Sequence, residues 1–158
     1  MTAADSFAEP RLSEWSEDYR LGVLDIDEQH RQLFVLVHDL WQAVHDPGKQ
    51  AALPRIFRRL EEYTIKHFRD EEMLMTVSAY PGCDLHQRAH AQFIASVDQA
   101  KARYLAGEGI PAETLVFFNN WLVRHIRVDD RAAADFYLGR LPPRSLLDKI
   151  FGRPGSTG

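Results

Sequence analysis

Histidines and carboxylates stand at helical spacing in several parts of this 158-residue chain, and together they could bind metal ions. His67 precedes Glu71 by four residues, and His86 precedes His90 by four. A spacing of four puts both side chains of a pair on one face of an α-helix. Single pairs of this kind often arise by chance, so the whole set carries the argument. The set comprises His30, His67, Glu71, His86, His90, His125 and one of the two adjacent residues Asp129 and Asp130.

Turn-forming residues divide the chain into four long segments with the apolar periodicity of amphipathic helices. The segments lie around residues 33–44, 54–75, 84–107 and 111–136. We expect Asp25 or Asp27 to cap the first and Asp84 to cap the third, because aspartate accepts hydrogen bonds from the first turn of a helix. Pro54 and Pro111 suit the first turns of the other two. Alternating β-branched residues are absent, so no sheet is expected.

Four helices joined by short turns favour an all-α fold, an antiparallel up-down-up-down four-helix bundle. In such a bundle the candidate ligands meet, because they stand at alternating ends of successive segments. His30 lies near the start of the first segment and His67 late in the second. His86 lies early in the third and His125 late in the fourth. All these positions fall at the same end of the bundle, which predicts one shared metal site.

The ligand count indicates two metal ions rather than one. Five imidazoles and two carboxylates without thiolates suit iron, ahead of manganese or zinc. If both carboxylates and one solvent oxygen bridge the ions, an ion with three histidines is fully coordinated. An ion with two histidines then keeps one position open, where a small diatomic ligand would bind.

The composition is that of a globular domain and argues against several other classes of protein. Nineteen basic and twenty-three acidic residues give a net charge of −4, with no basic cluster that would suggest nucleic acid or an anionic membrane as a partner. No apolar run is long enough to span a bilayer. The single cysteine, Cys83, excludes an internal disulfide and a cysteine-rich metal site. Because no export signal is visible, we expect a cytoplasmic protein.

Several short motifs between Trp15 and Phe136 form a pattern that is typical of one family. They are Trp15, the run Gly22–His30 with Leu33, His67-Phe68 with Glu71-Glu72 and Met75, Tyr80-Pro81, His86 with His90 and Phe93, and the run Trp121–Ile126 with Asp130. Through these motifs the chain resembles the bacterial hemerythrins. All seven liganding positions of that family find the required residue type here.

The resemblance implies how the ligands divide between two iron ions. His86, His90 and His125 would hold a closed iron, His30 and His67 would hold the open iron, and Glu71 and Asp130 would bridge the two. The family spaces its histidine and aspartate by five residues, which favours Asp130 over Asp129. Five residues turn about 140° away from the His125 face in a regular α-helix. We therefore predict a local widening of the π type between His125 and Asp130.

The resemblance also implies reversible dioxygen binding at the open iron, so we expect oxygen storage, delivery or buffering rather than an enzyme. A charge count favours reversibility, because oxygenation moves two electrons and the bridge proton onto dioxygen without changing the net charge of the buried centre. We expect Leu33 and Leu122 to line the dioxygen pocket, with Phe34 or Trp121 beside them. Two alternatives stay open. One is a sensor of oxygen, nitric oxide or redox state that acts through a partner, and the other is an enzyme that consumes peroxide or nitric oxide.

We expect one domain over residues 1–140, in which residues 1–24 form an arm packed on the bundle. A C-terminal tail follows at residues 141–158. Its apolar part, within residues 144–152, is a candidate docking segment for a protein partner, and the chain is otherwise expected to be a monomer.

Four remaining residues that could bind metal or react are expected to play no part in the site. His38 and His45 are expected to face solvent, and Cys83 to lie in the turn before the third helix. Glu72 is expected to point about 100° away from its neighbour Glu71.

Overall fold

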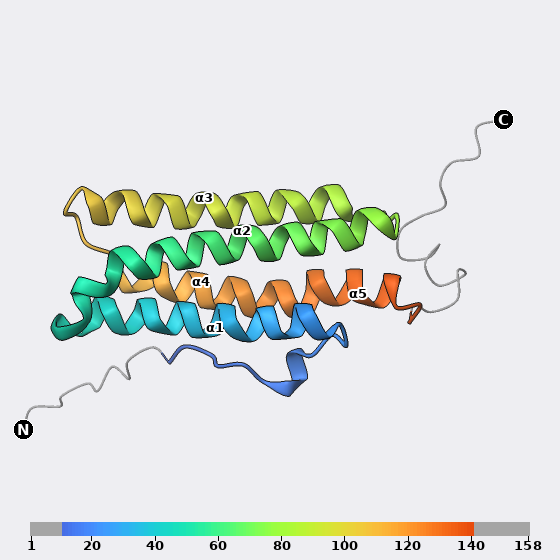
Figure 1. Cartoon of the computed structure of the whole chain (residues 1–158), viewed down its shortest axis with the longest axis horizontal. Coiled ribbons are helices and arrows are strands. Elements are labelled where there is room, and N and C mark those ends of the chain that lie inside the picture. The colour runs from blue at the N-terminus through green and yellow to red at the C-terminus, as the bar shows by residue number, and fades with distance from the viewer. Residues whose placement is uncertain (1–10, 141–158) are drawn as a thin grey trace, which may run out of the picture.

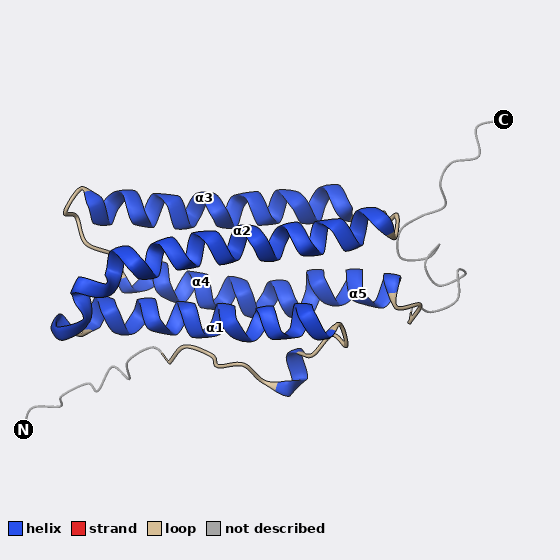
Figure 2. Cartoon of the chain, viewed as in Figure 1, coloured by secondary structure: helices blue, strands red, loops and turns tan. Residues whose placement is uncertain are grey.

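The computed structural model describes residues 11–140, which form a bundle of antiparallel helices (Figure 1). The α-helices are α1 (Leu24–His45), α2 (Leu53–Val77), α3 (Cys83–Leu105), α4 (Ala112–His125) and α5 (Arg131–Tyr137). The π-helical turn η3 (Ile126–Asp130) joins α4 to α5, and the short 3-10 turns η1 (Glu17–Tyr19) and η2 (Pro47–Ala52) precede α1 and α2. No strand occurs between residues 11 and 140 (Figure 2). The expected all-α four-helix bundle is confirmed, with α4, η3 and α5 together forming its fourth rod.

The start of α1 differs from the expectation that an aspartate caps it. Val23 occupies the N-cap position and makes no side-chain capping bond. Asp27 lies inside the helix, where its carboxylate accepts hydrogen bonds from the backbone N–H groups of Leu21 at 2.7 Å and Gly22 at 3.0 Å. Asp27 therefore fastens the loop that leads into α1 instead of capping the helix.

The start of α2 agrees with the prediction from the sequence, and the start of α3 does not. Pro54 stands in the first turn of α2, as expected, where its missing N–H costs no helical hydrogen bond. Asp84 does not cap α3, because the helix begins one residue earlier and Gly82 occupies its N-cap.

Large apolar side chains fill the half of the bundle that is remote from His30, His67, His86 and His125. Leu40, Phe57, Leu60, Leu115 and Phe118 are all fully buried there. Burying a side chain of this size stabilises a fold by about 1.5–3 kcal/mol. This core holds the four helices in register. The helix segments that carry the candidate ligands therefore meet at the other end of the bundle.

Residues 11–23 run along the outside of the bundle and lie against α1 and α4 (Figure 1). Leu12, Trp15 and Tyr19 pack on the core. The Asn119 side chain of α4 accepts a hydrogen bond from the Ser13 N–H at 2.8 Å and donates one to the Ser13 carbonyl at 2.9 Å. This described part of the expected arm is therefore fastened to the bundle by backbone hydrogen bonds as well as by apolar contacts.

The expected tail at residues 141–158, with its candidate docking segment at 144–152, lies outside the described residues. Of the helices between residues 11 and 140, none combines the length and apolar character that crossing a membrane requires.

Candidate metal centre

Seven side chains of metal-binding type lie buried together toward the end of the bundle where α1 and α3 begin. This is the right end in Figure 1. Each of these side chains is at most 5% exposed. They are His30 from α1, His67 and Glu71 from α2, His86 and His90 from α3, His125 from the end of α4, and Asp130 from the end of η3. The alternation of helix ends thus brings together all the residues for which the sequence suggested a metal-binding role.

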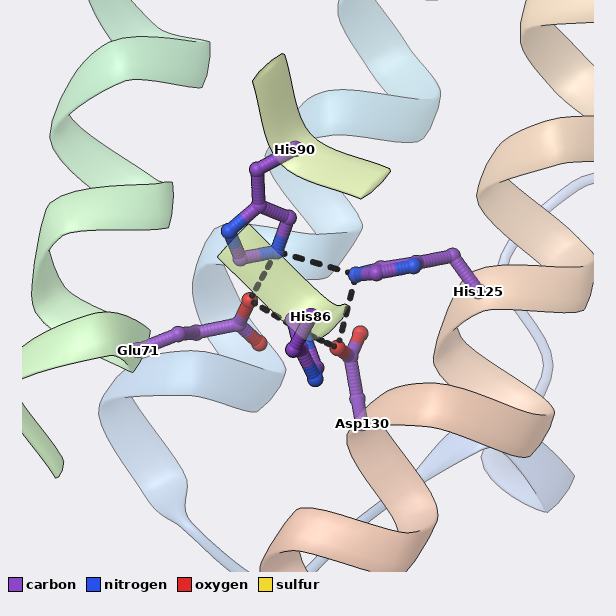
Figure 3. A group of neighbouring side chains, drawn as sticks. All are labelled: Glu71, His86, His90, His125 and Asp130. Carbon is purple, nitrogen blue, oxygen red and sulfur yellow. Dashed lines mark hydrogen bonds and ion pairs between the residues drawn. The ribbon is translucent and has the colours of Figure 1, made fainter. Parts of the chain in front are cut away.

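These side chains form two groups, each compact enough to surround one metal ion. In the larger group each residue offers one ligand atom, and these atoms lie within 4.8 Å of one another; Figure 3 shows its members, Glu71, His86, His90, His125 and Asp130. His30, His67 and Glu71 form a second group under the same limit. Because Glu71 belongs to both groups, the cluster could hold two metal ions that share a carboxylate.

The Asp130 carboxylate also lies between the two groups. Its Oδ2 atom is 3.1 Å from His30 Nε2. Its Oδ1 atom is 2.9 Å from His86 Nε2 and 3.0 Å from His125 Nε2. One oxygen therefore faces each group, which is the arrangement that a carboxylate bridging two ions requires.

Glu71, which lies on α2, also faces both groups. Its Oε1 atom is 3.4 Å from His30 Nε2. Its Oε2 atom lies 3.2 Å from His90 Nε2 and 3.6 Å from His67 Nε2. The two carboxylates together connect the group of three histidines to the pair formed by His30 and His67.

The predicted π-type widening is confirmed, since residues Ile126–Asp130 form the π-helical turn η3. A π turn has i→i+5 hydrogen bonds, so it brings the fifth residue after His125 back over the same face. Asp130 consequently faces the cluster, whereas Asp129 lies beside it with Oδ2 3.0 Å from His125 Nδ1.

Three of the histidines have their outer ring nitrogen bonded to side chains outside the predicted set of seven ligands. In each pair the Nδ1 atom faces the partner, so the Nε2 atom is left to face the cluster. The pairs are His67 with Gln29 at 2.9 Å, His90 with Glu72 at 2.9 Å, and His125 with Asp129 at 3.0 Å. Partners of this kind fix the orientation of metal-binding histidines.

These three partners share a signal that was visible in the sequence. Gln29, Glu72 and Asp129 each stand next to an expected ligand. Neighbours on a helix diverge by about 100°, which is why Glu72 was expected to play no part in the site. That expectation is wrong. Glu72 lies off the face of α2 that carries Glu71, but its carboxylate reaches the outer ring nitrogen of His90 on the adjacent helix α3.

The carboxylates change how readily the buried imidazoles hold protons. Burial alone would lower the pKa of His30, but Asp130 and Glu71 outweigh it and raise this pKa to about 9. Burial likewise opposes protonation of His125, whose pKa is nevertheless raised to about 10 by Asp130 and Asp129. Burial dominates for His67 and lowers its pKa to about 4. The two carboxylates thus stabilise positive charge at His30 and His125, as expected of a cation site, whereas His67 stays neutral.

Several buried polar atoms of the cluster make no hydrogen bond within the described part of the protein, which fits a metal centre. Although these side chains lie close together, some of their atoms make no hydrogen bond with any described residue: both ring nitrogens of His30, Oε2 of Glu71, Nε2 of His86 and both carboxylate oxygens of Asp130. An unsatisfied buried polar atom costs about 1–3 kcal/mol, and bonds to metal ions would remove this cost. The donor set of imidazole nitrogen and carboxylate oxygen, without thiolate, suits iron.

The other residues singled out by sequence lie as follows. His38 is half-buried, with Nε2 3.2 Å from the Ser13 carbonyl oxygen, so the expectation that it faces solvent is wrong because the arm covers it. His45 is exposed, as expected. Cys83 is half-buried and begins α3, where the sequence suggested the preceding turn.

The residues expected to line a dioxygen pocket are apolar and close to the cluster along the chain. Leu33 and Phe34 lie one helical turn after His30, and both are buried. Leu122 is also buried, and Trp121 stacks on the His125 ring with centroids 4.3 Å apart.

The chain is similar to known proteins of one family. The hemerythrin HHE cation binding domain matches residues 21–136. A bacteriohemerythrin of Stenotrophomonas maltophilia is 37% identical over 121 residues, covering 77% of this chain and 78% of that protein. A bacteriohemerythrin of Pseudomonas aeruginosa is 34% identical over 122 residues, covering 77% and 78% of the two chains. A myohemerythrin of Sipunculus nudus is 34% identical over 118 residues, covering 73% and 86%.

Proposed function

The chain belongs to the hemerythrin family, and from that premise we propose that it binds dioxygen reversibly at a di-iron centre, as an oxygen-storing, oxygen-delivering or oxygen-buffering protein. The observation that carries the proposal is the division of the buried cluster into three histidines and two histidines around two shared carboxylates. Such a division gives one iron a full set of ligands and leaves the other with a free position.

The ligand roles in this proposal follow the two groups. His86, His90 and His125 would hold the closed iron, while His30 and His67 would hold the open iron. Glu71 and Asp130 would bridge the ions, which is supported by the placement of their oxygens toward both groups. When bound, the two iron ions supply the electrons and the open position that dioxygen requires.

The apolar residues near the open position have the task of excluding water. Leu33 and Leu122 are the residues to which we assign this role, with the buried Phe34 following Leu33 on α1. Water and anions promote irreversible oxidation of iron, so a dry pocket favours the release of dioxygen unchanged. The predominance of neutral imidazoles in the donor set also favours reversible binding over oxygen-bond cleavage.

A visible-absorption experiment tests the proposal. The protein is loaded with iron, its metal content is measured, and it is reduced, exposed to air and then freed of oxygen over several cycles. We expect a colour change that appears with oxygen and disappears without it. A His67→Gln variant should lose this reversible change, whereas the matched His38→Gln variant, altered away from the cluster, should keep it. Immediate conversion of the native protein to a stable diferric form would contradict the proposal and favour a sensor or an enzyme.

A further inference from the structure

The outer nitrogens of the cluster histidines meet different chemical groups on the two sides. His90 Nδ1 lies 2.9 Å from a carboxylate oxygen of Glu72, and His125 Nδ1 lies 3.0 Å from one of Asp129. A carboxylate can only accept, so in both pairs Nδ1 donates its proton and Nε2 is free to bind metal. Both carboxylates are about 30% exposed, whereas both imidazoles are buried.

The group of two histidines has no such carboxylate partner. His67 Nδ1 lies 2.9 Å from the amide oxygen of Gln29, which is neutral. The Gln29 amide nitrogen donates to Asp70 at 2.7 Å, and that carboxylate is already paired with Lys66 at 2.6 Å. Behind the His67 ring the nearest negative charge is therefore one residue further out, and it is paired with Lys66. On the other side Asp129 also has a cation nearby, Arg124 at 3.5 Å, but its carboxylate contacts the imidazole directly. His30 Nδ1 has no hydrogen-bond partner at all among the described residues.

We propose that Glu72 and Asp129 are positioning residues that make the two metal positions unequal, binding the ion at the three-histidine position more tightly and favouring its ferric state. The inference rests on the ligand assignment in the proposed function. The outer carboxylates fix the rings of His90 and His125 and place negative charge behind them, which makes these ligands more strongly donating. Gln29 fixes the ring of His67 without adding charge.

The chain allows the two effects, positioning and charge, to be separated. In Glu72→Gln and Asp129→Asn an amide oxygen can still accept the imidazole proton, but the charge is lost. In Glu72→Leu and Asp129→Leu both the hydrogen bond and the charge are lost. Asp135→Asn is the control, because it removes a charge from α5 at an ion pair with Arg140 rather than at a histidine.

Zinc titration of the metal-free protein, read against a competing chelator, measures the positioning effect. We expect two binding events in the native protein, of which each leucine variant weakens the tighter by about 10- to 100-fold. The amide variants should stay within a few fold of native affinity. NMR of the zinc-loaded protein should show slowly exchanging Nδ1 protons for His90 and His125 in the native and amide variants only.

Reductive titration of the iron-loaded protein measures the charge effect. Each amide variant should shift one of the two reduction potentials to a more positive value, since a ferric ion loses a nearby negative charge, and Asp135→Asn should shift neither. Leucine variants that fold, by circular dichroism, and keep native zinc affinity would overturn the positioning role. Unchanged potentials in the amide variants would overturn the charge asymmetry. The zinc measurements need no dioxygen, so a native protein that binds two zinc ions but not oxygen would contradict the proposed function alone.

Discussion

Asp129 and Asp130 are adjacent in the chain, yet their carboxylates contact opposite edges of the His125 imidazole. Asp129 Oδ2 lies 3.0 Å from Nδ1, and Asp130 Oδ1 lies 3.0 Å from Nε2. In a regular α-helix the residue four positions after His125 would lie nearest its face, and the fifth would turn away. The π-helical turn η3 changes this order and assigns the inner position to Asp130 and the outer position to Asp129.

The first prediction concerns the inner carboxylate. Asp130→Asn keeps the shape of the side chain but removes the charge that faces both histidine groups, so we expect the protein to bind fewer than two iron ions. Elemental analysis of protein loaded with excess iron measures this directly. Asp98→Asn, a matched change on the exposed face of α3, should leave two ions bound. Two ions retained in Asp130→Asn would contradict the bridging role.

Sequence reasoning could predict the fold and the convergence of the site because both depend on periodicity. The positions of His30, His67, His86 and His125 alternate between helix ends, and antiparallel packing necessarily brings them to one end. The π turn could not be derived from helical spacing alone, since spacing favours Asp129 as the inner residue. It was predicted only because the resemblance supplied a spacing of five residues.

The outer partners of the histidines escaped prediction for a different physical reason. Whether Glu72 reaches His90 depends on the distance and rotation between α2 and α3, not on the helix that carries Glu72. The half-buried state of His38 likewise depends on where the arm crosses α1, and residues 11–23 show no helical period from which this could be read.

The second prediction concerns the stability of the metal-free protein. The folded state raises the pKa of His30 to about 9 and that of His125 to about 10, against about 6.5 in an unfolded chain. Their contribution to stability is therefore complete below about pH 6.5 and is lost as the pH rises through 9 to 10. Between about pH 6.5 and these folded-state pKa values, the free energy of unfolding should fall by up to about 1.4 kcal/mol per pH unit for each group. Urea unfolding in the presence of a chelator measures it.

The metal-loaded protein supplies the comparison for this prediction. Metal-bound imidazoles cannot hold a proton at the same nitrogen, so protons compete with metal and loading is weakened as the pH falls. Between pH 6.5 and 9 the loaded protein should not lose the stability that the metal-free protein loses. A metal-free protein that becomes more stable over this interval would contradict the pairing of protonated His30 and His125 with the inner carboxylates.

The third prediction concerns the apolar residues assigned to the dioxygen pocket. Leu33→Ala and Leu122→Ala should each open space beside the metal centre and admit water, so we expect faster irreversible oxidation of the oxygenated protein. Both changes should also destabilise the fold by about 2–5 kcal/mol, as deletions from a buried core do. The decay of the oxygenated visible spectrum measures the oxidation rate.

A change remote from the centre separates the pocket effect from the loss of stability. Leu40 is fully buried on α1, ten residues beyond His30, so Leu40→Ala should destabilise the fold comparably without changing the oxidation rate. Equal oxidation rates in Leu33→Ala, Leu122→Ala and Leu40→Ala would remove the pocket role from both residues.

The last prediction concerns the arm that covers one face of the site. Trp15 stacks near His30 with ring centroids 6.5 Å apart, and the arm that carries it is fastened to α4 through the two hydrogen bonds between Ser13 and Asn119. Asn119 is buried, so Asn119→Leu removes both bonds and leaves the Ser13 N–H without its partner. We expect a loss of about 1–3 kcal/mol in the free energy of unfolding.

Asn120→Leu, at the exposed neighbouring position, is the control and should change the free energy of unfolding by less than about 0.5 kcal/mol. Hydrogen exchange should show the Ser13 amide protected in the native protein and in Asn120→Leu but not in Asn119→Leu, because Asn119 is the acceptor of this amide's hydrogen bond. Protection that persists in Asn119→Leu would mean that the apolar contacts of Leu12, Trp15 and Tyr19 fasten the arm on their own.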